Sequence, residues 1–259
     1  MSNPTQPRVI AIIQGRMGSS RLPGKILKQL GGKPMLAHVV ERVQQARTVH
    51  QVVVATTSDG SDNEVAQFCR QQNIECYRGS LYDVLDRFYQ AARACRADVI
   101  VRITADCPLI DPAVIDRTVD AFFASGADFA ANRLPPPWKR TFPIGLDTEV
   151  CSFAALERAW REATLPHDRE HVMPYLYEEE GRFKVEVVDA AQDQGHLRWT
   201  VDTAEDLAAM RALFALLDDN PPLSWLDVLA VWQQHPEIHP INARVKHHWF
   251  NEYDERFKS

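Results

Sequence analysis

The chain has 259 residues, of which 45% are hydrophobic and 25% charged, and its formal net charge is −6. This length and balance suit one large or two small globular domains, and the negative charge argues against a broad nucleic-acid-binding surface. No apolar run approaches the roughly 20 residues that span a bilayer, and no secretory signal is apparent, so we expect no membrane insertion. Five cysteines without paired spacing predict reduced thiols in a cytoplasmic protein.

Strands and helices are predicted to alternate through the first half of the chain. Apolar, β-branched runs predict strands at 9–13, 51–57, 74–77, 97–104 and 127–132. Apolar residues at helical spacing predict helices at 34–47, 63–73, 83–95 and 112–123. Asp62 and Asp111 are placed to cap two of these helices. The alternation predicts an α/β fold, with mainly parallel strands joined by helices that cover both faces of the sheet.

The alternation loosens after about residue 134. The proline-rich segment 134–145 is expected to form a loop or lid near the sheet edge, because proline suits neither helix interiors nor central strands. Further elements are predicted as strands at 146–153, 182–188 and 197–203, and helices at 154–163 and 204–217. We therefore expect a main domain at 1–217 and a helical C-terminal appendage at 218–259, with one helix at 224–235.

The stretch "IIQGRMGSSRLPGK" (12–25) follows the first predicted strand. Backbone N–H groups of Gly18, Ser19 and Ser20 can form an anion nest, and nearby basic side chains add positive charge. The stretch matches neither a Walker A loop nor GxGxxG, so composition alone leaves a phosphate cradle and a solvated basic loop equally open. Ligands in such sheets bind beyond the carboxyl ends of the strands, which favours the phosphate cradle.

Three charged residues stand on or just beyond predicted strands. Asp106 follows the strand at 97–104, where a carboxylate suits Mg²⁺. Arg102 lies within that buried strand and needs an anionic partner, either a residue of the sheet or a ligand. Asp202 stands at another strand end, where it or Thr203 can cap the next helix, or where it can join Asp106 at a metal site.

Two further segments carry polar side chains whose chemistry the pattern leaves open. Alternation places Asp147 and Glu149 on one face of an extended segment, where they can bind sugar hydroxyls, ligate a metal or face solvent. His167 and His171 stand four residues apart, but the residues between them do not complete a zinc motif, so zinc is disfavoured there. We interpret Asp168 as a helix cap, and Glu170 or His171 as a surface or pocket residue.

Seven motifs together resemble one known family. They are "QGRMGSSRLPGKIL", "VVVATT", "RGSLYDVLDRFYQAA", "RITADCPLID", "GLDTEV", "REHVMPY" and "WTVDTAEDL", spread over residues 9–217. In this order they resemble the sugar cytidylyltransferases, which include the CMP-Kdo and CMP-sialic acid (acylneuraminate) synthetases. The closest resemblance is to the SpsF-like branch of spore coat polysaccharide synthesis. The chain has Gly15 where alanine is usual, a difference expected to matter little.

The resemblance implies a Rossmann-like nucleotidyltransferase fold and Mg²⁺-dependent transfer of CMP from CTP to an acidic 2-keto sugar, with release of pyrophosphate. It implies catalytic roles for Arg21, Lys25, Asp106 and Asp202, the two aspartates as metal ligands. The implied nucleotide-binding residues are Gln14, Arg16, Gly18, Ser19, Ser20, Arg21, Lys25, Arg78, Gly79, Ser80, Asp83 and Thr104. The implied acceptor-sugar residues are Arg102, Gly145, Asp147 and Glu149.

Other interpretations stay open beside this one. Arg102 and Thr104 differ from the residues of the CMP-Kdo enzymes, which leaves the acceptor sugar open. A glycosyltransferase that uses a nucleotide sugar, or a non-catalytic nucleotide-binding protein, is the alternative function. The family and the aromatic residues of the C-terminal tail, Trp225 and Trp232 among them, favour a homodimer, although these aromatics can equally pack on their own domain.

Overall fold

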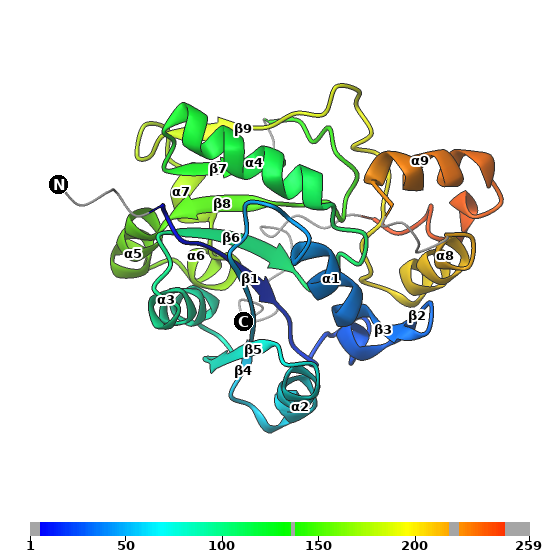
Figure 1. The fold of residues 1–259 in the computed structure, drawn as a ribbon, viewed down its shortest axis with the longest axis horizontal. Helices are drawn as coiled ribbons and strands as arrows, with labels where there is room; N and C mark the ends of the chain where they lie inside the picture. Colours follow the sequence, from blue (N-terminus) through cyan, green and yellow to red (C-terminus); the bar gives the residue numbers. More distant parts are fainter. Residues whose placement is uncertain (1–5, 136–137, 218–222, 247–259) are drawn as a thin grey trace.

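The computed structural model of the protein describes residues 6–135, 138–217 and 223–246 (Figure 1). Its main feature is a seven-stranded sheet in the order β5-β4-β1-β6-β8-β7-β9. The strands are β1 (Val9–Gln14), β4 (Gln51–Thr57), β5 (Glu75–Gly79), β6 (Val99–Thr104), β7 (Phe129–Ala131), β8 (Glu149–Ser152) and β9 (Val185–Val187). All neighbouring pairs are parallel except those of β8, which is antiparallel to both β6 and β7. The predicted α/β fold with a mainly parallel sheet is confirmed, and β8 makes the sheet mixed.

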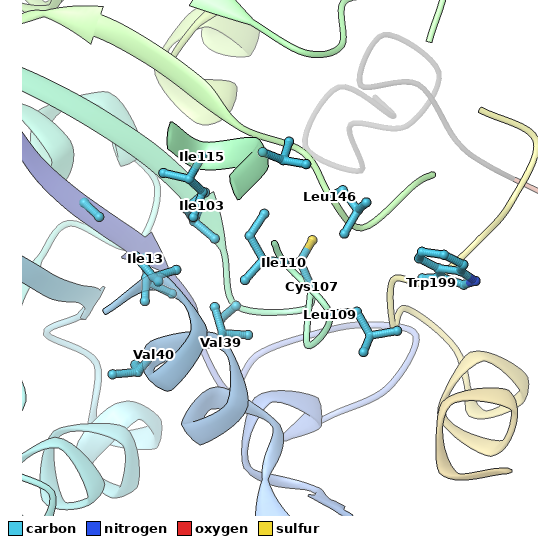
Figure 2. Packing of buried hydrophobic residues seen from close by; sticks show 14 of the residues in the cluster. Ile13, Val39, Val40, Ile103, Cys107, Leu109, Ile110, Ile115, Leu146 and Trp199 are labelled. Atoms are coloured by element: carbon cyan, nitrogen blue, oxygen red, sulfur yellow. The ribbon is translucent and has the colours of Figure 1, made fainter. Parts of the chain in front are cut away.

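Helices cover both faces of this sheet, as predicted. They are α1 (Met35–Val43), α2 (Asn63–Gln71), α3 (Val84–Ala94), α4 (Pro112–Ser125), α5 (Phe153–Glu162), α6 (Pro166–His171), α7 (Pro174–Tyr177), α8 (Ala204–Phe214) and α9 (Trp225–Gln234). Alternate residues of β1 enter two separate apolar cores, since neighbouring strand side chains point to opposite faces. Ile13 packs in the core that contains Val39 of α1 and Ile115 of α4, which Figure 2 shows. Ile12 packs on the other face with Phe88 of α3.

The predicted strand at 197–203 is wrong. Within it the structure has only an isolated bridge between Ile144 and Arg198. The backbone N–H of Trp199 donates to the Ile144 carbonyl and that of Val201 donates to the Asp106 carbonyl, so the segment bonds to loops rather than to a strand. The short hairpin of β2 (Gln29–Leu30) and β3 (Lys33–Pro34) and helix α7 were not predicted. The predicted cap by Asp168 is wrong, because Asp168 lies within the first turn of α6, whose N-cap is Leu165.

The helix caps differ in how well the sequence predicted them. Asp111 caps α4, because its carboxylate accepts a hydrogen bond from the Val114 backbone N–H at 3.0 Å. The α8 cap is Thr203, in a capping box with Asp206, and not Asp202. Asp62 occupies the N-cap position of α2, as predicted, but its side chain makes no cap hydrogen bond: the carboxylate instead accepts from the backbone N–H groups of Met17 and Thr57. Asp62 thereby fastens the glycine-rich loop to the end of β4.

The C-terminal helix α9 packs against the main body. Its Val228 and Trp232 are buried in the same core as β1 and α1, and the Trp232 ring lies 6.3 Å from that of Trp199. The Trp225 ring lies 5.6 Å from that of Phe142. Those two tail aromatics therefore pack on their own domain; the tail residues from 247 onward lie outside the described residues. A boundary at 217/218 and a homodimer stay predictions. No helix of the described residues has the length and apolar character to cross a membrane.

Candidate active site

A cavity of about 430 Å³ opens at the carboxyl ends of β1 and β6. Ten of the predicted site residues line it: Gln14, Arg16, Gly18, Ser19, Ser20, Arg21, Lys25, Thr104, Asp106 and Asp202. They come from the loop after β1, the end of β6 and the start of α8, segments far apart in the sequence. The sheet topology brings the β1 and β6 ends together, because the ends of parallel strands share one edge. The segment before α8 is held beside them by the Val201 backbone N–H, which donates to the Asp106 carbonyl.

The glycine-rich loop lies along one wall of the cavity. The Ser19 backbone N–H donates to the Met17 carbonyl, whereas those of Gly18 and Ser20 have no protein acceptor in the part of the chain that the structure describes. Two N–H donors are therefore available to bind an anion. A Cβ at Gly15 would lie 2.7 Å from the Cβ of Ala105, so the difference from alanine matters: the loop and the β6 end approach closely here.

Lys25 stands at the centre of the charged wall. Its ammonium lies 2.7 Å from Asp106 Oδ2 and 2.9 Å from Asp202 Oδ1. Burial alone would lower the pKa of Lys25, but the two carboxylates outweigh it and raise the pKa to about 12. The side chain is therefore a stable positive charge that bridges one carboxylate just after β6 and one just before α8.

Asp202 belongs to a wider ionic network. Besides Lys25 it contacts Arg21 at 3.1 Å and Arg198 at 2.9 Å. Burial alone would raise its pKa, but Lys25, Arg21 and Arg198 together hold it well below the ordinary range for aspartate. The buried Arg198 is itself held by Asp206 at 2.8 Å. Asp202 is thus a carboxylate anion in an orientation set by surrounding cations.

The two aspartates suit a cation. Their carboxylate oxygens already converge on a single positive group, the Lys25 ammonium. Carboxylates with nearby room for phosphate oxygens are the donor set that Mg²⁺ prefers. The residues present therefore fit a magnesium ion beside Lys25.

The loop after β5 forms the rim of the cavity, through Leu81 and Tyr82 together with Arg87 of α3. The Arg87 side chain is buried, donates to the Ser80 carbonyl at 2.9 Å, and its Nε has no hydrogen-bond partner among the described residues. Burial and the nearby Arg16 lower its pKa to about 10. Sequence reasoning missed Arg87, although it lies beside Val84 and Phe88 on the face predicted to be buried, and a buried cation signals an anionic partner.

Four predicted nucleotide-site residues shape this rim without lining the cavity. Arg78 donates to the carbonyls of Thr57 and Asp59, each at 2.8 Å, and so braces the β4 end. Asp83 caps α3 and pairs with Arg169 at 2.6 Å. The Ser80 hydroxyl accepts from the Asp83 backbone N–H at 3.0 Å. The fourth residue, Gly79, ends β5 in register with Thr57 of β4.

The four predicted acceptor-sugar residues do not line the cavity either. Arg102 pairs with Glu149 across the β6–β8 register and donates to Gln14 Oε1 at 3.1 Å. Its expected anionic partner is therefore a residue of the sheet. Asp147 accepts from Arg140. Gly145 has φ +110°, and a Cβ there would lie 2.7 Å from the Trp199 carbonyl carbon, so this glycine permits a close backbone approach.

Three comparisons connect this chain with known proteins. The sequence model of the cytidylyltransferase family matches residues 10–219. The spore coat polysaccharide biosynthesis protein SpsF of Bacillus subtilis is 30% identical over 236 residues, which is 88% of this chain and 95% of SpsF. The 3-deoxy-manno-octulosonate cytidylyltransferase of Anaeromyxobacter dehalogenans is 31% identical over 243 residues, 80% of this chain and 98% of that enzyme. A cytidylyltransferase structure from Leptospira borgpetersenii superposes with a TM-score of 0.85 at 32% identity, over 94% of this chain and 100% of that one.

Proposed function

This chain belongs to the cytidylyltransferase family, as its motifs predicted, and we propose that it transfers CMP from CTP to an acidic 2-keto sugar and releases pyrophosphate. The single observation that carries this proposal is Lys25, which bridges Asp106 and Asp202 at the end of a loop with open backbone donors. Such a site combines positive charge for phosphates with carboxylates for a cation. The similarity to SpsF supports a role in surface polysaccharide synthesis.

The glycine-rich loop would hold the triphosphate. Backbone N–H groups of Gly18 and Ser20 would donate to phosphate oxygens, and Arg16 would add a charge-assisted contact. Arg21 and Lys25 would neutralise the charge that develops on the departing pyrophosphate. Phosphoryl-type transfers depend mostly on positioning and charge stabilisation, which these fixed donors supply.

Asp106 and Asp202 would hold Mg²⁺, which when bound withdraws charge from the α-phosphate oxygens and orients that group for in-line attack. Asp202 is kept ionised by its three cationic neighbours, so it is ready to bind a cation at neutral pH. Lys25 lies between the two carboxylates, and we infer that its ammonium turns toward the phosphates when nucleotide binds. The acceptor hydroxyl would then attack the α-phosphate from the opposite side to pyrophosphate.

The acceptor sugar would lie beyond Gln14, toward the β6–β8 side of the sheet. The relative from Anaeromyxobacter is a cytidylyltransferase for 3-deoxy-manno-octulosonate, which supports an acidic acceptor. Arg102 is the cationic residue closest to such a role, although it acts through Gln14 rather than at the cavity wall. Asp147, Glu149 and Gly145 would shape this end indirectly, through the ion pairs and close approach described above.

The test is a screen of the four nucleoside triphosphates against a panel of 2-keto sugar acids, with Mg²⁺ present and pyrophosphate as the readout. We expect release that requires CTP, Mg²⁺ and one sugar acid. A parallel arm offers nucleotide sugars and measures nucleoside diphosphate, the product that a glycosyltransferase would give. Diphosphate release without pyrophosphate release, or CTP binding without any turnover, would contradict the proposal.

A further inference from the structure

One group of metal-ligating side chains lies away from the cavity, between the start of α6 and the end of α7. Nε2 of His167 lies 3.0 Å from Glu178 Oε2 and 3.5 Å from Asp168 Oδ1. All three donor atoms lie within 4.8 Å of one another. We propose that His167, Asp168 and Glu178 form a binding site for a divalent transition-metal ion such as Zn²⁺.

The spacing of the donor atoms suits tetrahedral coordination. Zinc binds imidazole nitrogen and carboxylate oxygen at about 2.0–2.2 Å, so neighbouring donors of a tetrahedral site lie about 3.4 Å apart. The observed separations of 3.0 and 3.5 Å bracket that value. The side chains of His167 and Glu178 are 32% and 36% exposed, which leaves room for water as a fourth ligand. One imidazole and two carboxylates are donors that zinc accepts.

The buried carboxylate of Asp168 is the second observation that points to a cation. Asp168 is 3% exposed, and its Oδ1 atom has no hydrogen-bond partner among the residues that the structure describes. This atom is the one that faces His167. A buried carboxylate oxygen without a donor is costly, and a bound cation removes that cost.

The neighbouring arginines do not supply this cation. Arg169 and Arg182 both act on Asp168 electrostatically, but their guanidinium groups bond elsewhere. Arg169 donates to Asp83, and Arg182 donates to Glu179. Two carboxylates therefore face one imidazole. The local charge is negative and favours a divalent ion.

Metal at this site would connect two short helices beside the cavity. His167 and Asp168 lie in the first turn of α6, and Glu178 follows the last residue of α7. Helix α6 also contains Glu170, which lines the cavity. A bound ion would hold α6 in place and so stiffen this side of the rim. The site rests on its own geometry and does not depend on the proposed nucleotide chemistry.

The chain provides a matched control for the experiment. His235 and Glu237 form a similar histidine–glutamate pair, with Nδ1 and Oε1 2.8 Å apart. No buried aspartate completes that pair within the described residues. His235→Gln therefore removes a comparable histidine without removing a predicted zinc ligand.

The test is zinc titration of the tag-free full-length chain after treatment with a chelator, followed by calorimetry. We expect His167→Gln and Glu178→Gln to weaken one zinc-binding event by about tenfold or more, and His235→Gln to leave all events unchanged. Any zinc that Asp106 and Asp202 bind would be common to all these proteins, so the difference isolates the proposed site. Co²⁺ in place of zinc should give a visible absorption band that His167→Gln abolishes.

Two results would overturn the metal site. One is equal zinc affinity of the wild type, His167→Gln and Glu178→Gln. The other is a wild type that binds no zinc beyond what Asp106→Asn removes. Melting of each variant without metal shows whether it is folded, and Glu178→Gln, with its partly exposed side chain, keeps the test decisive if His167→Gln is unstable.

Discussion

Two charged regions meet along one edge of the sheet, and they use their charges differently. On the β6–β8 side, Arg102 is paired with Glu149, and Asp147 is paired with Arg140. At the rim of the cavity, Arg87 is even more deeply buried but donates only to a backbone carbonyl, and its Nε lacks a partner in the described structure. Buried charge alone therefore does not identify a ligand site; the missing counter-ion does. Four substitutions test how the two regions differ, three at the cavity and one on the β6–β8 side.

The largest effect is expected from Asp106→Asn, which removes one carboxylate from the pair that Lys25 bridges. The shape is kept, so the fold should survive, but a cation ligand is lost. We expect the rate of pyrophosphate release from CTP to fall on the order of 10²–10³-fold. Steady-state kinetics with a melting curve measure both properties.

The control for this substitution is Asp116→Asn. Asp116 is a carboxylate on α4 that contacts Thr48 and Arg47 and does not line the cavity. Its loss should leave the rate unchanged. A near-normal rate for Asp106→Asn would remove Asp106 from the proposed mechanism.

On the β6–β8 side, substitution of Arg102 is expected to lower the free energy of unfolding. Arg102→Leu leaves Glu149 buried without its partner, and breaking such a pair costs about 3–5 kcal/mol of unfolding free energy. The double substitution Arg102→Leu with Glu149→Leu should recover most of this loss, because no buried charge remains. Urea denaturation measures both. A loss below about 1 kcal/mol for the single variant would mean that the pair is not structural.

At the rim of the cavity, substitution of Arg87 is expected to weaken the binding of CTP. Arg87→Met leaves no carboxylate unpaired, so stability should hold, whereas the KM for CTP should rise about tenfold, the usual worth of one charge-assisted contact. Arg78→Met is the contrast: it removes the bonds to Thr57 and Asp59 and should lower the melting temperature more than it raises KM. If Arg87→Met destabilised the protein without changing KM, Arg87 would be structural, like Arg102.

The sequence predicted most of the sheet because strongly apolar runs such as β1 and β4 dictate their own conformation. It also placed Asp106 correctly beside the glycine-rich loop, since strand ends share an edge. Prediction from the sequence failed where contacts between distant parts of the chain determine the local structure. The segment 197–203 reads as a strand, yet its partners are loops, and Asp62 stands at a helix start while its carboxylate holds Met17 and Thr57.

Sequence patterns do not show which buried charges form ion pairs with each other. Arg102 was expected to need an anion, but its partner Glu149 lies 47 residues away, opposite it only because β8 runs antiparallel to β6. The same reasoning applies to Arg87, whose lack of a counter-ion among the described residues is a property of three-dimensional packing. A sequence shows which charged residues fall on a buried face, but only the fold shows whether an opposite charge lies beside each of them.

The smallest effect is expected from Tyr82→Ala. Tyr82 lines the rim but is 64% exposed, unusual for a large aromatic side chain, and a ring at the mouth of a polar cavity can stack on a base or ribose. Stacking on aromatic side chains is worth about 1–3 kcal/mol per base, and the exposed rim favours the low end, so KM for CTP should rise about fivefold. Tyr82→Phe keeps the ring and should behave as wild type. Phe123→Ala removes an exposed ring of α4 that does not line the cavity, so it should leave KM unchanged. Equal changes in KM for Tyr82→Ala and Phe123→Ala would show that Tyr82 does not contact the nucleotide.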